Sequence, residues 1–294
     1  MTINEYINQN FLQFKKMIKK MNCLCELKNV SFYSNSVPNY ENYTVQLLYA
    51  LRYHFGYAFE YADMYNKLMK VSDIYNKISV LSVGCGNGID LWSLQYALSR
   101  INRDISIEYY GIDAIDWVNK IEGREYDSIN YHICDIADIN KNINYIKKFD
   151  VIFFPKSISE LDTSDLKAIV DFVDQKTNNI YVLSSYRASE YRLNEDVDKY
   201  TFFCKALIHK GFKIFFGELD NYYIFNNNVG LIAYDDNFEY PQKALDYVTN
   251  LHKKCLSYDD ECQECVEHCI DDLNRIPILK TGNIRYNMVG LQRK

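Results

Sequence analysis

The stretch Val80-Leu81-Ser82-Val83-Gly84-Cys85-Gly86-Asn87-Gly88 joins a short apolar run directly to a Gly-x-Gly-x-Gly loop. Gly84 permits a tight turn, and Gly86 lets a ligand approach the backbone where another residue would place a Cβ atom. A helix beginning near Ile89 would present N–H groups and the positive end of its dipole to that ligand. The order of strand, loop and helix therefore predicts a nucleoside-binding site.

Short apolar runs alternate with longer amphipathic stretches on both sides of this loop. The runs cover residues 78–83, 107–112, 129–133, 151–154 and 180–183. Stretches of helical length, such as 91–99 and 164–174, lie between them. Strands that are separated by helices predict βαβ units and a parallel sheet.

The sheet is predicted to end in antiparallel strands. A helical stretch at 197–210 is followed by three apolar runs, at 213–216, 222–225 and 230–234. Three consecutive asparagines at 226–228 predict a turn, so the last two runs form a hairpin. We therefore predict an α/β fold with a Rossmann-like, mostly parallel seven-stranded sheet that ends in an antiparallel hairpin.

The chain divides into three predicted parts. Residues 1–70 form a helical N-terminal segment, with an amphipathic helix at 3–21 and an aromatic-rich helix at 43–70. Residues 71–235 form the Rossmann-like domain. Residues 236–294 form a Cys-rich C-terminal extension, which we expect to lie beyond the sheet.

Asp113 follows the second predicted strand. In nucleoside sites of this topology, an acidic residue at that strand end accepts hydrogen bonds from the ribose hydroxyls. The alternative is that Asp113 caps the next helix, but its occurrence together with the glycine loop favours ribose binding. A nicotinamide dehydrogenase is disfavoured, because its loop is usually Gly-x-Gly-x-x-Gly and no hydride-transfer residues follow.

Four segments resemble motifs of the class I S-adenosylmethionine-dependent methyltransferases. The glycine loop is similar to their first motif, and Tyr110-Gly111-Ile112-Asp113 is similar to their second. His132-Ile133-Cys134-Asp135-Ile136 resembles the segment whose acidic residue contacts the adenine amino group. Phe149-Asp150-Val151-Ile152-Phe153-Phe154 is similar to the fourth-strand motif. The resemblance implies S-adenosylmethionine as the cofactor, bound by residues 71–235, and methyl transfer as the activity.

The resemblance also implies a set of cofactor-binding residues. They are Gly84, Cys85, Gly86, Asn87, Gly88, Asp90, Asp113, Asp135 and Phe154. Ser82 departs from the family pattern, which often has an acid two residues before the first glycine. Asp90 would then supply the negative charge that faces the methionine ammonium. Because of Ser82, a nucleoside-binding protein without turnover remains the alternative.

Polar residues follow the fourth and fifth predicted strands, toward which the methyl group would point. The leaving group of this in-line displacement is neutral, so the enzyme mainly positions the acceptor and, for some acceptors, removes a proton. Lys156 and Glu160 after the fourth strand, and Tyr186 after the fifth, are the predicted catalytic residues. The alternative for each is a loop that caps the neighbouring helix. The acceptor itself is not identified.

Composition limits the partners. The formal net charge is -6, which disfavours binding to phosphate backbones, so a small-molecule acceptor is favoured over RNA, and DNA is not expected. An RNA acceptor would need a local basic patch. No apolar run approaches the ~20 residues of a membrane span, and the N-terminus lacks the pattern of a secretory signal. We therefore expect a cytoplasmic protein with reduced thiols and no membrane partner.

Four cysteines crowd near the C-terminus together with His252 and His268. The cysteines are Cys255, Cys262, Cys265 and Cys269. Thiolate and imidazole groups at this spacing suit tetrahedral zinc, with an iron–sulfur cluster as the second choice. The last three cysteines, at i, i+3 and i+7, also lie on one face of a helix, where buried cysteines behave as small apolar residues. Both interpretations remain open at this point.

Overall fold

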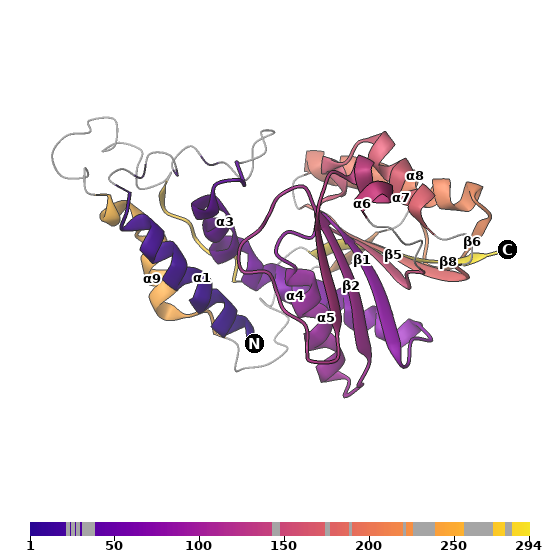
Figure 1. The fold of residues 1–294 in the computed structure, drawn as a ribbon, viewed down its shortest axis with the longest axis horizontal. Coiled ribbons are helices and arrows are strands. Elements are labelled where there is room, and N and C mark those ends of the chain that lie inside the picture. The colour runs from indigo at the N-terminus through magenta and orange to yellow at the C-terminus, as the bar shows by residue number, and fades with distance from the viewer. Residues whose placement is uncertain are drawn as a thin grey trace. The chain divides into compact units, whose positions relative to one another are not determined.

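The computed structural model describes residues 1–21, 24, 27, 30, 39–142, 148–173, 177–187, 190–219, 222–225, 239–255, 273–279 and 284–294. The chain forms two compact units. One contains Met1–Phe59, Trp117–Asn119 and Gly230–Thr281, and we call it the helical unit. The other contains Glu60–Asp116, Lys120–Val229 and Gly282–Lys294, and we call it the sheet unit (Figure 1).

The helical unit begins with α1 (Ile3–Ile18), an amphipathic helix. Its N-terminus has a capping box, in which Thr2 Oγ1 accepts from the Glu5 amide and the Glu5 carboxylate accepts from the Thr2 amide. The apolar face of α1 is buried, and α9 (Gln242–Thr249) packs beside it. The amphipathic pattern predicted at 3–21 therefore corresponds to a helix packed on a core.

Further helical segments complete the unit. They are α3 (Tyr43–Tyr49), the π-helical η1 (Ala50–His54), the first turn of α4 (Phe55–Val71) and the 3-10 helix η4 (Leu251–Lys254). The aromatic-rich helix predicted at 43–70 is thus present, with a π-helical turn in its interior. Among the described residues, no helix is long and apolar enough to cross a membrane.

Eight strands form one sheet within the described residues. They are β1 (Lys77–Val83), β2 (Ser106–Asp113), β3 (Ser128–Ile133), β4 (Val151–Pro155), β5 (Asn179–Ser185), β6 (Phe212–Phe216), β7 (Tyr223–Phe225) and β8 (Ile284–Arg293). Their order is β3-β2-β1-β4-β5-β8-β6, and β7 pairs with β8 off this path. Strands β1 to β5 pair in parallel, whereas β8 is antiparallel to β5, β6 and β7.

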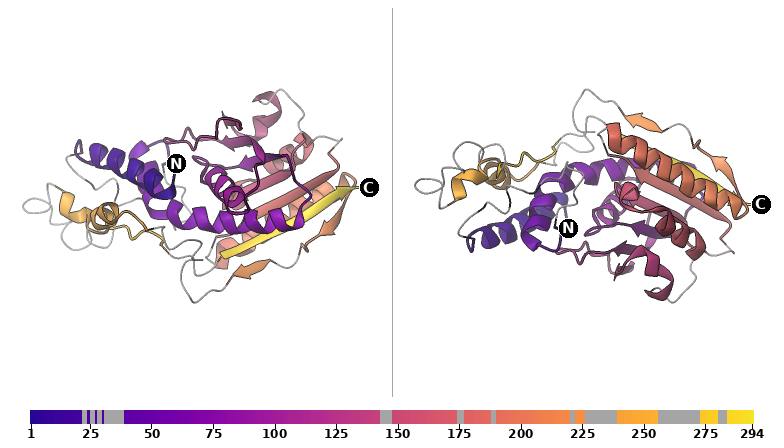
Figure 2. Two further views of the ribbon diagram at one scale, coloured as in Figure 1. Left: turned by 90° about the horizontal axis from the view of Figure 1, so that it is seen from below. Right: turned by 90° about the horizontal axis from the view of Figure 1, so that it is seen from above.

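Helices cover both faces of this sheet (Figure 2). The longer ones are α5 (Ile89–Arg100), α7 (Thr163–Phe172) and α8 (Glu190–His209). Short segments lie near the strand ends, namely η2 (Ile136–Asp138), α6 (Ile139–Asn142) and η3 (Ile158–Glu160). Because both faces are covered, the central strands are buried on both sides and appear in the sequence as continuous apolar runs.

The predicted fold class is confirmed, with one correction. The sheet is mostly parallel and ends in antiparallel strands, as expected. However, β8 lies between β5 and β6, with Ile180 opposite Leu291 and Ser184 opposite Asn287. The expectation that residues 236–294 lie beyond the sheet is therefore wrong for this strand. The predicted strand 230–234 and its turn lie outside the described residues, and the described partner of β7 is β8.

Candidate active site

The glycine loop leaves the carboxyl end of β1 with three left-handed glycines. The φ angles are 67° at Gly84, 58° at Gly86 and 85° at Gly88, a region that strains any residue with a Cβ atom. A Cβ atom on Gly84 would lie 2.5 Å from the Ser157 Cβ, and one on Gly88 would lie 2.0 Å from the Tyr131 hydroxyl. Packing, in addition to conformation, therefore requires glycine at both ends of the loop.

Hydrogen bonds fasten this loop to the end of β2. The amides of Gly84 and Cys85 both donate to the Ile112 carbonyl, at 2.8 and 3.1 Å. The amide of Gly86 donates to Asp113 Oδ2 at 2.8 Å. The structure thus brings the predicted ribose ligand Asp113 into direct contact with the central glycine of the loop.

The Asp113 carboxylate also accepts the Ile115 amide, at 2.9 Å on its other oxygen, and the residue is half-buried. A carboxylate can accept about four hydrogen bonds. The alternative that Asp113 caps the next helix is wrong, because residues 114–127 form no helix; the carboxylate accepts the amide of a bend and keeps capacity for a ligand.

Asp90 lies in the first turn of α5 and is fully buried. The Tyr109 hydroxyl donates to its two oxygens at 2.9 and 3.1 Å. Burial raises the pKa of Asp90 to about 6, while the hydroxyls of Ser82 and Tyr109 and the first amides of α5 oppose the rise. The first N–H groups of α5 therefore interact with this buried carboxylate. The sequence had predicted that they would face a ligand.

The other predicted cofactor residues have different surroundings. Asp135 is exposed at the end of β3 and caps η2. Cys85 and Asn87 are buried within the loop. Phe154 is fully buried and packs edge-to-face on Phe203 at 5.1 Å between ring centroids, so its side chain belongs to the core beside α8.

A buried ion pair joins the carboxyl ends of β4 and β5. The ammonium of Lys156 lies 2.7 Å from Glu60 Oε1 and donates to the Tyr186 carbonyl at 2.8 Å. The Ser185 hydroxyl donates to the same Glu60 oxygen. The side chains of Lys156 and Glu60 are 10% and 3% exposed, so the pair is almost completely withdrawn from water.

Arg187 links the same two loops nearer to solvent. Its Nε donates to the Lys156 carbonyl at 3.1 Å, and its guanidinium forms an ion pair with the exposed Glu160. The Arg187 amide donates to the buried Asp196 at 2.9 Å. The loops 155–160 and 184–187 therefore share one edge of the sheet, and the predicted catalytic residues Lys156 and Glu160 belong to one network.

Tyr186 is placed differently from the other two predicted catalytic residues. It is fully buried, and its ring packs edge-on against Tyr200 and Tyr222 at 6.1 Å in each case. Burial raises the pKa of its hydroxyl well above the usual range. In this conformation the side chain has no access to an acceptor at the surface, and its backbone carbonyl is the part that reaches Lys156.

Sequence reasoning missed Glu60. Glu60 lies in the apolar and aromatic part of the helix between Phe55 and Tyr65. An unpaired charge is costly to bury there, so the sequence did indicate that this carboxylate needs a partner. The cation that balances it comes from Lys156, 96 positions along the chain, and only the fold reveals that pairing.

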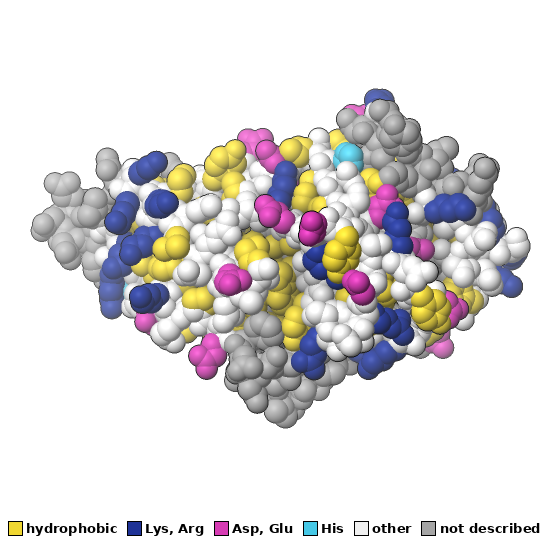
Figure 3. Space-filling model, turned by 60° about the horizontal axis from the view of Figure 1, so that its bottom comes forward, with side chains coloured by type: hydrophobic (Ala, Val, Ile, Leu, Met, Phe, Trp, Pro, Cys, Tyr) yellow, Lys and Arg dark blue, Asp and Glu magenta, His cyan; other side chains and the backbone are white. Residues whose placement is uncertain are grey.

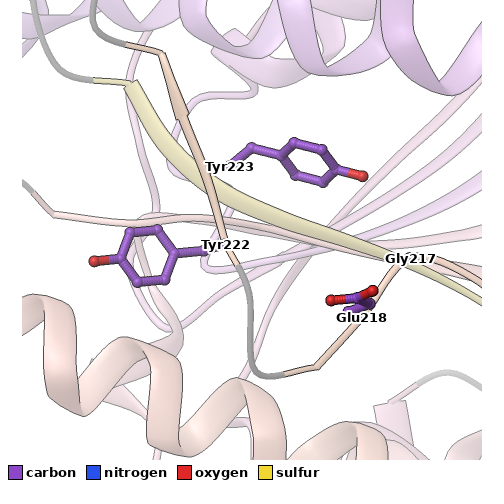
Figure 4. A pocket seen from close by; sticks show the side chains of 4 residues that line it. All are labelled: Gly217, Glu218, Tyr222 and Tyr223. Atoms are coloured by element: carbon purple, nitrogen blue, oxygen red, sulfur yellow. The ribbon is translucent and has the colours of Figure 1, made fainter.

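A cavity of about 350 Å³ lies at the antiparallel end of the sheet, lined by Gly217, Glu218, Tyr222 and Tyr223 (Figure 4). The two tyrosine side chains point away from each other. The Tyr223 ring stacks on Tyr286 at 5.2 Å. These residues were not predicted to form a site, because no partner strand was expected at 284–293.

The predicted metal site is mostly outside the described residues. Cys262, Cys265 and Cys269 lie there, while Cys255 is described and buried. The neighbouring His252 has its Nδ1 2.9 Å from Asn274 Oδ1. Where the structure is described, no group of three or more His, Cys, Asp or Glu residues is placed to hold a metal. The zinc site therefore stays a prediction.

No protein-family model and no curated protein matches this sequence. Several solved structures are distantly similar to it. The plantazolicin methyltransferase BpumL in complex with SAH is 13% identical with a TM-score of 0.41, covering 96% of this chain and 100% of that one. A cyclopropane-fatty-acyl-phospholipid synthase-like protein from Lactobacillus casei is 10% identical with a TM-score of 0.40, covering 80% and 92%. The [4+2]-cyclase SpnF is 10% identical with a TM-score of 0.36, covering 79% and 81%.

The sheet itself identifies the fold. Five parallel strands run in the order β3-β2-β1-β4-β5, and an antiparallel strand, β8, separates β5 from β6. The glycine loop follows the central strand β1, and an acidic residue ends the adjacent β2, as in doubly wound nucleoside-binding sheets. This chain has the Rossmann-like α/β fold of the class I methyltransferases.

Proposed function

We propose that this protein binds S-adenosylmethionine at the glycine loop and Asp113, and transfers its methyl group to an acceptor at the carboxyl ends of β4 and β5. The observation that carries the proposal is the hydrogen bond between the Gly86 amide and the Asp113 carboxylate. It puts an acceptor of hydrogen bonds, and a negative charge, at the point of the loop where a nucleoside ribose would lie.

The hydrogen bonding of the loop suits a nucleoside better than a dinucleotide. A pyrophosphate needs free backbone N–H groups at the loop and the helix N-terminus. Here the amides of Gly84, Cys85 and Gly86 donate to protein acceptors, and α5 holds the buried Asp90 carboxylate at its own N-terminus. S-adenosylmethionine carries no phosphate, so a loop whose amides are already paired, beside the half-buried Asp113 carboxylate, suits it.

The network at β4 and β5 would position the acceptor. Lys156 is held by Glu60 as the cation of an ion pair, so it acts as a hydrogen-bond donor and a positive charge. Because sulfonium methyl transfer has a neutral leaving group, no general acid is needed there. We therefore propose that Lys156, with the Arg187–Glu160 pair beside it, orients the acceptor.

A nucleoside-binding protein without turnover is the second candidate. It is favoured by the observation that the polar groups at the ends of β4 and β5 bond to one another and that Tyr186 is buried. The discriminating experiment measures S-adenosylhomocysteine released from S-adenosylmethionine during a screen of small-molecule and RNA fractions, with Asp113→Asn as the negative control. Release with the wild type and not with the variant supports the enzyme. Tight cofactor binding without release from any fraction supports the second candidate.

A further inference from the structure

The helical unit carries exposed lysines that methyl transfer does not use. We call them the lysine surface, and they are Lys15, Lys16, Lys19, Lys20, Lys253 and Lys254. Lys15 and Lys16 lie in the last turn of α1, and Lys19 and Lys20 follow directly after its end. Lys15 and Lys16 occupy a different side of α1 from its buried apolar face.

The Tyr247 ring connects the two groups of lysines through the apolar face of α1. The Lys254 ammonium is 5.5 Å from the centre of the Tyr247 ring on α9. That ring packs edge-on against Phe11 at 5.4 Å and Phe14 at 6.4 Å, both on α1. Tyr247 therefore joins the end of η4 to the lysine-bearing part of α1. Figure 3 shows the Lys and Arg side chains gathered over this end of the helical unit.

Within the part of the chain that the structure describes, the lysine surface has no acidic partners. None of its six ammonium groups forms an ion pair with a residue that the structure describes. Several lysines of the sheet unit are paired, as Lys120 is with Asp116 and Lys210 with Asp171. A concentration of like charge on a chain whose net charge is -6 creates a local positive potential that attracts anionic partners.

We propose that the lysine surface binds the phosphodiester backbone of a nucleic acid. Lysine is a flexible point charge that contacts phosphates without reading the base sequence. Protein interfaces are depleted in lysine at their centres, which disfavours a protein partner. A membrane is disfavoured because the apolar face of α1 is buried within its own unit, so this face is not available for insertion into a lipid bilayer. This surface supplies the local basic patch that the acidic composition did not predict.

The test measures fluorescence anisotropy of labelled single-stranded oligo(U) RNA and oligo(dT) DNA of about 20 nucleotides, longer than common single-strand sites. The first variant changes Lys15, Lys16, Lys19 and Lys20 to Glu. The matched control changes Lys70, Lys167, Lys205 and Lys213 to Glu, four exposed lysines of the sheet unit. Both variants have the same net charge, and circular dichroism confirms that each is folded.

We expect the wild type to bind both oligonucleotides at low salt, because a phosphate contact does not depend on the sugar. The α1 variant should lose at least about tenfold in affinity, whereas the control should lose much less. The dependence of log affinity on log salt concentration should become shallower by about 3, since each phosphate contact to a single strand contributes about 0.7. Changing the same four α1 lysines to Gln should cause an intermediate loss.

Equal losses in the α1 variant and the control would overturn the proposal, because net charge and not this surface would then govern binding. Absence of oligonucleotide binding by the wild type at low salt would also overturn it. So would binding to phosphatidylserine vesicles without binding to either oligonucleotide, since the surface would then belong to a membrane. None of these results depends on the cofactor, so the proposal stands or falls separately from methyl transfer.

Discussion

Replacing Gly88 with Ala tests whether packing against Tyr131 requires glycine at the end of the glycine loop. Gly88 has a φ angle of 85° and precedes α5, and the Tyr131 hydroxyl occupies the space where a Cβ atom would go, 2.0 Å from it. The same hydroxyl donates its one hydrogen mainly to the Ile121 carbonyl at 2.9 Å, with the Asn87 carbonyl as a second, longer acceptor at 3.3 Å. The methyl group that Gly88→Ala introduces would therefore displace Tyr131.

The expected cost follows from these contacts. A left-handed conformation costs a residue with a Cβ atom about 1–2 kcal/mol. Displacing the Tyr131 hydroxyl forfeits its one donated hydrogen bond, which contributes about 1 kcal/mol. We therefore expect Gly88→Ala to lower the free energy of unfolding by about 2–3 kcal/mol.

Gly211 is the matched control. Its φ angle is 97°, and no heavy atom lies within 4 Å of the position of an added Cβ. Gly211→Ala should therefore carry the conformational cost alone, about 1–2 kcal/mol. Urea unfolding of both variants is followed by the fluorescence of Trp92, which lies in α5, in a Trp117→Phe background.

The double variant Gly88→Ala/Tyr131→Phe separates the contact from the conformation. Both single changes lose the same hydrogen bond, so together they should cost about 1 kcal/mol less than their sum. If Gly88→Ala cost no more than Gly211→Ala, or if the two changes were strictly additive, the packing of Gly88 against Tyr131 would be refuted.

Two further substitutions test the buried charges. Glu60→Gln should lower the free energy of unfolding by about 3–5 kcal/mol, because it leaves the Lys156 cation buried without its counter-charge. In urea unfolding, the double variant Glu60→Gln/Lys156→Met should recover part of that loss. The folded pKa of Asp90, about 6, lies above its ordinary 3.8, so the stability contributed by this group is fully present below pH ~4 and is lost as the pH rises through 6. Asp90→Asn should therefore be more stable than the wild type at pH 7, by up to about 3 kcal/mol, with the difference vanishing near pH 4; a difference that does not change with pH would contradict this.

The central strands of the parallel half of the sheet were predictable from the sequence because they are buried on both faces. Such strands appear as unbroken apolar runs, and those predicted at 78–83 and 107–112 correspond to β1 and β2 within a residue or two. Asp113 and the loop were also predictably close, since parallel neighbours end at the same edge.

Strand β8 could not be recognised in the same way. Its residues 286–291 are buried, but they include the fully buried Asn287, so the strand is neither a continuous apolar run nor a regular alternation. Its place is decided by pairing with β5, whose Ser184 lies opposite Asn287 although the two are far apart in the sequence. Pairing at such a separation leaves no local pattern.

The polar groups of the site show the same limit. Lys156 and Glu160 were identified by their position after a strand, which is a local property. The Glu60–Lys156 pair and the burial of Tyr186 depend on which helix covers the carboxyl ends of β4 and β5, and that is a property of the packed structure.

Calorimetric titration with S-adenosylhomocysteine tests the central claim most directly. We predict binding at one site per chain, weakened at least about tenfold by Asp113→Asn, because charge-assisted hydrogen bonds contribute about 1.5–3 kcal/mol. Asp116→Asn is the matched control, since Asp116 is exposed and paired with Lys120, and it should bind like the wild type. Absence of binding by the folded wild type, or equal affinity of the Asp113→Asn variant, would contradict the assignment of the glycine loop and Asp113 as the cofactor site.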